Sequence, residues 1–250
     1  IREALRLEGI EGIRLDYDAD IPARTGLATS SSFAVGLVNT LGAFKGETRT
    51  KRELADKAIH IERVMCNEVG GIQDQISSAF GGLNLIEFYD VHSVQLSKRR
   101  KLDFQTNLML FYTKIQRTSS EIQKKIKTPG EINKNLLTLK HLAIEGYECL
   151  TNEKQNLDDF GQILNEAWKS KKGLSDAVTT SFIDECYVKG LEAGALGGKV
   201  LGAGGGGFLL FYVPYSRQEA VRNALSDLIE IKFCFEEQGS QILLNFKDDL

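Results

Sequence analysis

The chain has 250 residues, with 31 Lys and Arg against 34 Asp and Glu, and a formal net charge of −3 at pH 7. Its 42% hydrophobic residues and 3 prolines exclude collagen-like and strongly disordered classes. The near-balanced charge does not favour an electrostatic nucleic-acid partner, and no apolar run reaches the roughly 18–20 residues that would span a bilayer.

The first hundred residues predict a strand, three helices and a second strand. Residues 12–20 alternate apolar and polar side chains as a strand does, and Ile21-Pro22 ends the pattern. Apolar residues at helical spacing predict helices over residues 33–44 and 51–67. Thr50-x-x-Glu53 fits a capping box at the start of the second helix. A short helix over residues 72–80 and a strand over 83–89 complete this half.

The second half predicts a buried strand over residues 107–113 and mostly helical sequence from 119 to 172. A helix over 182–193 leads into a glycine-rich hairpin over 194–207. A strand over 208–213, a helix over 217–229 and a strand over 241–246 follow. This order predicts an α+β class with antiparallel strands. We interpret the basic run at 98–101 as a solvated turn between strands, and predict domains over 1–100 and 101–250.

The segment from Pro22 to Phe33, PARTGLATSSSF, places small residues and four consecutive hydroxyls at the start of a predicted helix. A helix N-terminus has unpaired N–H groups and a partial positive charge, so it attracts phosphate. Gly26 can adopt a positive φ, and the hydroxyls can bond phosphate oxygens or ligate Mg²⁺. The alternative is an ordinary Ser-rich helix cap. The segment is not a Walker A motif, because no Gly-Lys-Ser/Thr follows.

Two carboxylates and a glycine run favour the phosphate-loop interpretation. Phosphoryl transfer needs one carboxylate to hold Mg²⁺ and another to orient or deprotonate the attacking hydroxyl. Glu62 and Asp74 suit these roles, and the alternative is a solvated helix charge and a helix-capping acid. Five glycines within Gly202–Gly207 exceed what a plain hairpin needs, which indicates a close approach of backbone or ligand. Arg117 suits a substrate phosphate, and a surface position is the alternative.

Together these segments resemble the GHMP kinase family, named for galactokinase, homoserine kinase, mevalonate kinase and phosphomevalonate kinase. The family motif P-x-x-x-G-L-G-S-S-A/S is similar to Pro22–Ser32, and its G-A-G-x-G-G hairpin is similar to Gly202–Gly207. Ala28 and Thr29 stand where the family usually has Gly and Ser. The resemblance implies a two-lobed fold, with a ribosomal protein S5 domain 2-like N-terminal lobe and a ferredoxin-like C-terminal lobe. It also implies ATP and Mg²⁺ as cofactors.

The resemblance implies a role for each matching residue. Asp74 matches the catalytic aspartate, and Ser30 and Glu62 match the residues that bind the metal. The expected ATP-binding residues are Pro22, Gly26, Leu27, Ala28, Thr29, Ser30, Ser31 and Ser32. The expected substrate-binding residues are Gly204, Gly205 and Gly206, to which we add Arg117. The family's first motif, R-I-S-F-x-G-G-G-T-D, is absent, and the missing initiator Met predicts that it lies upstream of Ile1.

Within the family, segments such as TGLATSSSF and GALGGKVLGAGGGGFLLFYVP are most similar to the heptose 7-phosphate kinases. We therefore expect transfer of the γ-phosphate of ATP to the anomeric hydroxyl of a sugar or sugar phosphate, with D-glycero-D-manno-heptose 7-phosphate as the first candidate. The alternatives are L-fucose kinase, another GHMP small-molecule kinase, and a non-catalytic nucleotide- or sugar-binding regulator. A homodimer is a possible assembly, and no nucleic-acid or membrane partner is expected. Four cysteines without zinc-like spacing and no visible signal peptide predict a cytoplasmic protein.

Overall fold

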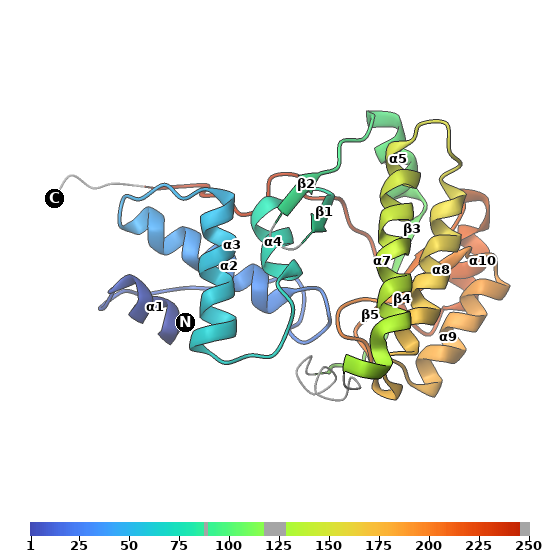
Figure 1. Ribbon diagram of the computed structural model, residues 1–250, viewed down its shortest axis with the longest axis horizontal. Helices are drawn as coiled ribbons and strands as arrows, with labels where there is room; N and C mark the ends of the chain where they lie inside the picture. Colours follow the sequence, from blue (N-terminus) through green and yellow to red (C-terminus); the bar gives the residue numbers. More distant parts are fainter. Residues whose placement is uncertain (88–89, 118–128, 246–250) are drawn as a thin grey trace. The chain divides into compact units, whose positions relative to one another are not determined.

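The computed structural model describes residues 1–87, 90–117 and 129–245, which form two compact units (Figure 1). Unit 1 contains residues 1–23, 28–93 and those from Glu236 onward, and unit 2 contains residues 24–27 and 94–235. The segment after Glu236 joins unit 1 because Gly82 N–H donates to the Glu236 carbonyl at 2.6 Å and Ser240 N–H donates to the Ser78 carbonyl at 3.1 Å. Apart from residues 24–27 and those from Glu236 onward, the units divide at residues 93/94. The domain boundary at residues 100/101 stays a prediction.

The described part of unit 1 consists of helices followed by a small antiparallel sheet. Apolar residues of α2, α3 and α4 form most of its core, including Val35, Leu41, Leu54 and Ile76. The elements are α1 (Arg2–Glu8), α2 (Thr29–Phe44), α3 (Lys51–Ile59), the π-helix η1 (His60–Met65), α4 (Gln73–Phe80), β1 (Asn84–Glu87) and β2 (Asp90–Ser93).

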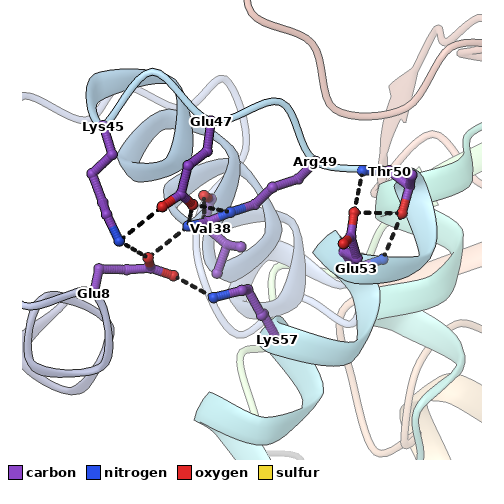
Figure 2. Close-up of polar contacts among 8 residues, drawn as sticks. All are labelled: Glu8, Val38, Lys45, Glu47, Arg49, Thr50, Glu53 and Lys57. Carbon is purple, nitrogen blue, oxygen red and sulfur yellow. Dashed lines mark hydrogen bonds and ion pairs between the residues drawn. The ribbon is translucent and has the colours of Figure 1, made fainter.

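Local sequence signals predicted α2, α3 and α4, whereas α1 was not predicted. The capping box is confirmed: Glu53 N–H donates to Thr50 Oγ1 at 3.2 Å, and Thr50 N–H donates to the Glu53 carboxylate at 2.8 Å (Figure 2). Helix α2 begins at Thr29, earlier than predicted, because its first turn contains hydroxyl residues that the apolar pattern does not include. The helix predicted over 51–67 changes into η1 after Ile59.

Two of the strand predictions are wrong, because the described residues form no strand at these positions. Residues 12–20 and 241–245 belong to no strand. Ile13 and Leu15 do keep the predicted alternation, since both are half-buried against the core of unit 1. A strand also needs a neighbouring backbone to complete its hydrogen-bond ladder. The period-two pattern predicts which side chains face the core but cannot supply that neighbour.

Unit 2 is built on a four-stranded antiparallel sheet in the order β4-β5-β3-β6. β3, the first of these four strands along the chain, therefore lies between β5 and β6, as in a ferredoxin-like arrangement. The elements are α5 (Lys98–Thr106), β3 (Leu108–Tyr112), α7 (Pro129–Thr151), α8 (Asp158–Lys172), η2 (Asp176–Val178), α9 (Ser181–Glu192), β4 (Gly197–Val200), β5 (Phe208–Tyr212), η3 (Tyr215–Arg217), α10 (Gln218–Ala224) and β6 (Ile229–Ile231).

One hydrophobic cluster of unit 2 lies on one face of this sheet, and Phe208 and Tyr212, which alternate with its members along β5, are also buried. Phe111 and Phe211 of the sheet pack with Ile183 and Tyr187 of α9 and with Val221 of α10. Helices α7 and α8 lie side by side (Figure 1). The helix predicted over 217–229 ends early, because residue 229 enters β6 opposite residue 112. Within the described ranges, no helix combines the length and the apolar character needed to cross a membrane.

The basic run at 98–101 is not a solvated turn, so that interpretation is wrong. It opens α5, where Ser97 Oγ accepts the Arg100 N–H at 3.2 Å. Arg100 is buried, and its guanidinium donates to the carbonyls of Leu150 (2.6 Å), Gln155 (3.1 Å) and Cys149. It thereby satisfies carbonyls at the C-terminal end of α7, where the helix dipole favours a cation.

Candidate active site

Helix α2 begins behind a residue in the left-handed conformation. Its N-cap is Ala28, with φ 57° and ψ 23°, and no side chain caps the helix. The alternative of an ordinary Ser-rich cap is therefore wrong, and the hydroxyls of Ser30 and Ser31 donate to Glu62 instead. A glycine would adopt this φ more easily than Ala28 does. The N–H groups of the first turn have no partner within the helix, which suits them to an anion.

Glu62 is the centre of a buried polar cluster in unit 1. The residue is 5% exposed and lies on η1. Its Oε1 accepts from Ser30 Oγ at 2.6 Å, and its Oε2 accepts from Ser31 Oγ at 2.9 Å and from Gln75 Nε2 at 2.5 Å. The π-helical turn changes the direction of side chains relative to α3, and such turns are frequent at functional sites.

A second buried glutamate of unit 1 has the cationic partners that Glu62 lacks. The Glu8 side chain is 2% exposed and lies 2.6 Å from Arg49 Nη2, 2.9 Å from Lys57 Nζ and 3.4 Å from Lys45 Nζ (Figure 2). Among the described residues, no Lys or Arg side chain forms an ion pair with Glu62, whose side-chain partners are two hydroxyls and an amide. A buried carboxylate with neutral partners favours a bound cation.

The chemistry of these donors fits Mg²⁺. Ser30 and Glu62 supply hard oxygen atoms, and Mg²⁺ is usually held by one or two protein oxygens together with substrate phosphates. The described residues contain no group of three or more His, Cys, Asp or Glu that could hold a metal ion without such help. The two residues predicted to bind the metal therefore lie together in the structure.

Asp74 lies half-buried in the first turn of α4. Arg63 fixes the turn before it, because its Nε and Nη2 donate to the Gly71 carbonyl at 3.0 and 2.7 Å. Asp74 and Ser78 are four residues apart and so share one face of the helix. Ser78 Oγ lies 3.0 Å from Ser32 Oγ in the first turn of α2. This face of α4 is therefore next to the hydroxyl-rich end of α2.

Gln75 is a site residue that the sequence analysis missed. It is fully buried and donates to Glu62. It also interrupts the apolar face of α4 that Ile76 and Ala79 help to form. A polar residue inside an apolar helix face was the available signal, since buried amides are retained with hydrogen-bond partners.

In unit 2, the glycine-rich hairpin holds residues 24–27 at close range. A Cβ on Gly26 would lie 2.7 Å from the Leu201 carbonyl oxygen, and a Cβ on Gly202 would lie 2.7 Å from Gly26 Cα. Gly207 is equally restricted, because a Cβ there would overlap the Thr25 carbonyl. The prediction that these glycines allow backbone to approach backbone is confirmed.

The predicted substrate-binding residues also lie in unit 2. Gly205 N–H donates to the Val178 carbonyl at 2.7 Å, next to Gly204, and a Cβ on Gly206 would lie 2.6 Å from Ile115 Cγ2. Arg117 is exposed, and its Nε donates to the Gly205 carbonyl at 3.2 Å. These contacts describe how the loop is held, and the substrate-binding role of the four residues stays a prediction.

The predicted phosphate loop is shared between the units. Pro22 is exposed and belongs to unit 1, Leu27 is half-buried and belongs to unit 2, and Thr29 opens α2 in unit 1. The structure thus brings the hydroxyls and Glu62 together in unit 1, and Gly26 and the glycine hairpin together in unit 2.

We expect a Gly26→Ala variant to lose about 1–3 kcal/mol of stability, because an alanine at φ +81° is strained and its Cβ meets the Leu201 carbonyl. The affinity of this variant for ATP should fall as well. Urea denaturation and nucleotide titration measure the two effects. Gly36→Ala is the matched control, since nothing lies within 4 Å of a Cβ at that helical position. The control should be as stable as the wild type or slightly more so, and equal stability of both variants would contradict the expectation.

Comparison with known proteins places the chain in a family. The model described as GHMP kinases N terminal domain matches residues 1–82, and the model GHMP kinases C terminal matches residues 148–230. The chain belongs to the GHMP kinase family. This GHMP kinase chain is 32% identical over 218 residues to D-glycero-alpha-D-manno-heptose 7-phosphate kinase of Campylobacter jejuni, a match that covers 83% of the chain and 63% of that protein.

Other members of the family show similar relations. L-fucokinase/L-fucose-1-P guanylyltransferase of Bacteroides fragilis is 29% identical to this GHMP kinase chain over 84% of the chain and 23% of that protein. The structure of a D-glycero-D-manno-heptose 1-phosphate kinase from Bacteroides thetaiotaomicron superposes with a TM-score of 0.68 at 27% identity, over 88% of the chain and 64% of that structure. The chain thus spans less than two thirds of the length of these heptose kinases. The predicted α+β GHMP kinase fold is confirmed.

Proposed function

We propose that this protein is an ATP-dependent sugar kinase that transfers the γ-phosphate to the anomeric hydroxyl of a sugar or sugar phosphate. The Glu62 cluster is the observation that supports this most. A buried carboxylate without an ionic partner among the described residues accepts hydrogen bonds from hydroxyls in the first turn of α2. A helix N-terminus, a hydroxyl and a carboxylate are together what a metal–nucleotide complex requires.

In the proposed reaction, the first-turn N–H groups of α2 and the hydroxyls of Thr29 and Ser32 bind the phosphates of ATP. Ser30 and Glu62 would hold Mg²⁺, which when bound neutralises charge on the phosphates. Asp74 orients the acceptor hydroxyl or takes its proton. The hydroxyl oxygen then bonds to the γ-phosphorus in line as the bond from that phosphorus to ADP breaks. The protein contributes mainly positioning and charge neutralisation.

We propose D-glycero-D-manno-heptose 7-phosphate as the first acceptor to test, because the C. jejuni relative of that name is 32% identical. Arg117 would bind the phosphate that this acceptor already has, because a guanidinium suits a phosphate and its Nε is already fixed by Gly205. L-Fucose is the second candidate, on the basis of the 29% identical B. fragilis relative. A homodimer and a cytoplasmic location remain predictions.

The test is incubation of the whole protein with ATP, Mg²⁺ and, in parallel, heptose 7-phosphate, L-fucose, galactose or no sugar. We expect ADP to form with heptose 7-phosphate, and the product to have a new phosphate at the anomeric carbon, which ³¹P NMR identifies. Preferential turnover of L-fucose would assign the second candidate. ATP binding without turnover of any sugar would contradict the kinase proposal and favour the regulator.

A further inference from the structure

Gln75 presents its amide nitrogen to Glu62 from the buried face of α4. The residue is 0% exposed, and its Nε2 lies 2.5 Å from Glu62 Oε2. An ionised carboxylate only accepts hydrogen bonds, so the amide nitrogen and not the oxygen must face it. The amide oxygen is also buried, and it has no hydrogen-bond partner among the described residues.

Stability gives only part of the reason for a glutamine at this position, because the amide donates to the buried Glu62 carboxylate but leaves its own oxygen unpaired. Apart from that hydrogen bond, a buried amide with an unpaired oxygen is less favourable than an apolar side chain of similar size. The neighbouring buried positions of α4, Ile76 and Ala79, are apolar. What the amide supplies is a donor in a fixed direction, whereas the hydroxyls of Ser30 and Ser31 can rotate about their C–O bonds.

The two oxygens of Glu62 therefore have different surroundings. Oε2 accepts from both Gln75 and Ser31, whereas Oε1 accepts from Ser30. We propose that Gln75 is a positioning residue that fixes the Glu62 carboxylate so that Oε1 faces the metal together with Ser30 Oγ. This inference rests on the proposed function, since it concerns the same site. Groups behind a metal ligand that orient it in this way affect metal affinity nearly as strongly as ligands do.

Two consecutive residues of α4, Asp74 and Gln75, have different proposed roles, and the helix fixes their side chains relative to each other. Asp74 lies on the face of α4 that meets Ser32 through Ser78, and Gln75 lies on the face that meets Glu62. A rotation of α4 about its axis would move both side chains together. The acceptor-orienting carboxylate and the metal-binding carboxylate would thereby keep a constant relation to the first turn of α2.

The test uses the whole protein, Mn²⁺ as the metal probe and a non-hydrolysable ATP analogue. Gln75→Met keeps the length of the side chain and removes the donor, and Gln75→Asn keeps the amide but withdraws it by one methylene. We expect both variants to bind Mn²⁺ about 10- to 100-fold more weakly in the presence of the analogue. Metal-free binding of the analogue should not change, and both variants should remain folded at the assay temperature, although Gln75→Met should melt somewhat lower because the buried Glu62 carboxylate loses a donor.

Gln73→Met is the matched control, because Gln73 is an exposed residue of the same helix. It should bind Mn²⁺ as the wild type does. Mn²⁺ affinity of the Gln75 variants close to that of the wild type would overturn the inference. An equal loss of analogue binding with and without metal would also overturn it, since that identifies a purely structural role. Because the readout is binding, it stands even if the wild type phosphorylates none of the sugars, which would refute the proposed function alone.

Discussion

An Asp74→Asn variant is expected to fold like the wild type and to lose sugar-dependent ATP turnover by about 10²–10⁴-fold. The amide has the same shape as the carboxylate but can neither take a proton nor attract the developing charge on the acceptor oxygen. Asp74 lies half-buried on α4, and the neighbouring Ser78 on the same face contacts the first turn of α2. The measurement is ADP release with and without the sugar that the wild type accepts.

Two controls separate a chemical role of Asp74 from a structural one. The melting temperature and the dissociation constant of ATP should stay unchanged in Asp74→Asn. Asp56→Asn is the matched variant, because Asp56 is exposed on α3 and pairs with Arg52 at 3.0 Å. It should keep nearly full turnover, since exposed pairs contribute little. If Asp74→Asn kept more than half of the wild-type turnover, Asp74 would have no part in the chemistry.

Glu8→Gln is expected to lower the free energy of unfolding by about 3 kcal/mol at neutral pH. Removing one partner of a buried charge group typically costs about 3–5 kcal/mol. We expect the lower end, because Lys45 and Lys57 are 36% and 38% exposed and can turn toward water. Arg49 cannot, since its side chain is 5% exposed and its Nη1 donates to the Val38 carbonyl at 2.7 Å (Figure 2).

Glu47→Gln is the matched control for Glu8. Glu47 pairs with the same Lys45 and Arg49, at 3.0 and 2.5 Å, but its side chain is 44% exposed. Its removal should therefore cost much less stability than the removal of Glu8, because water screens an exposed pair. Urea denaturation of both variants measures the difference. Equal losses would mean that burial of the Glu8 carboxylate does not determine the strength of this cluster.

The stability that Glu8 contributes should also depend on pH. Burial by itself would raise the pKa of Glu8, but hydrogen bonds and charges from Arg49 and Lys57 lower the pKa from 4.5 to about 2. The unfolded chain therefore binds more protons than the native protein between these values. The difference in stability between wild type and Glu8→Gln should be complete well above pH 4.5 and disappear as the pH falls toward 2. A difference that stays constant down to about pH 3 would refute the low pKa.

Local patterns of the sequence were sufficient for much of the fold and part of the site. The capping box at Thr50, the helical spacing after Phe33 and the strand at 107–113 depend on neighbours a few residues apart, so the order of residues alone reveals them. The glycine run at 202–207 was informative for a related reason. Close backbone contacts at Gly202, Gly204 and Gly207 exclude a Cβ at these positions, and that exclusion is visible directly as residue type.

Other features depend on partners far away in the sequence, and no local pattern identifies them. In the sequence, Arg100 is one of four consecutive basic residues. Only the fold shows that carbonyls at and just after the end of α7 accept hydrogen bonds from its guanidinium. Residues 12–20 have a strand pattern without a neighbouring strand in the described part. Gln75 became a site residue because the π-turn of η1 directs Glu62 toward it.

The sequence by itself predicted the class of fold and the residues around α2 that suit a phosphate, and it named Glu62 and Asp74 as the candidate acidic residues of the site. The tertiary structure decided which of two buried glutamates is free of cationic partners among the described residues. Glu8 forms ion pairs with Arg49 and a lysine from the segment between α2 and α3, and with a second lysine from α3. Glu62 instead accepts hydrogen bonds from Ser30, Ser31 and Gln75. Burial and charge pairing are properties of groups that meet in space, which is why the sequence alone could not distinguish the two.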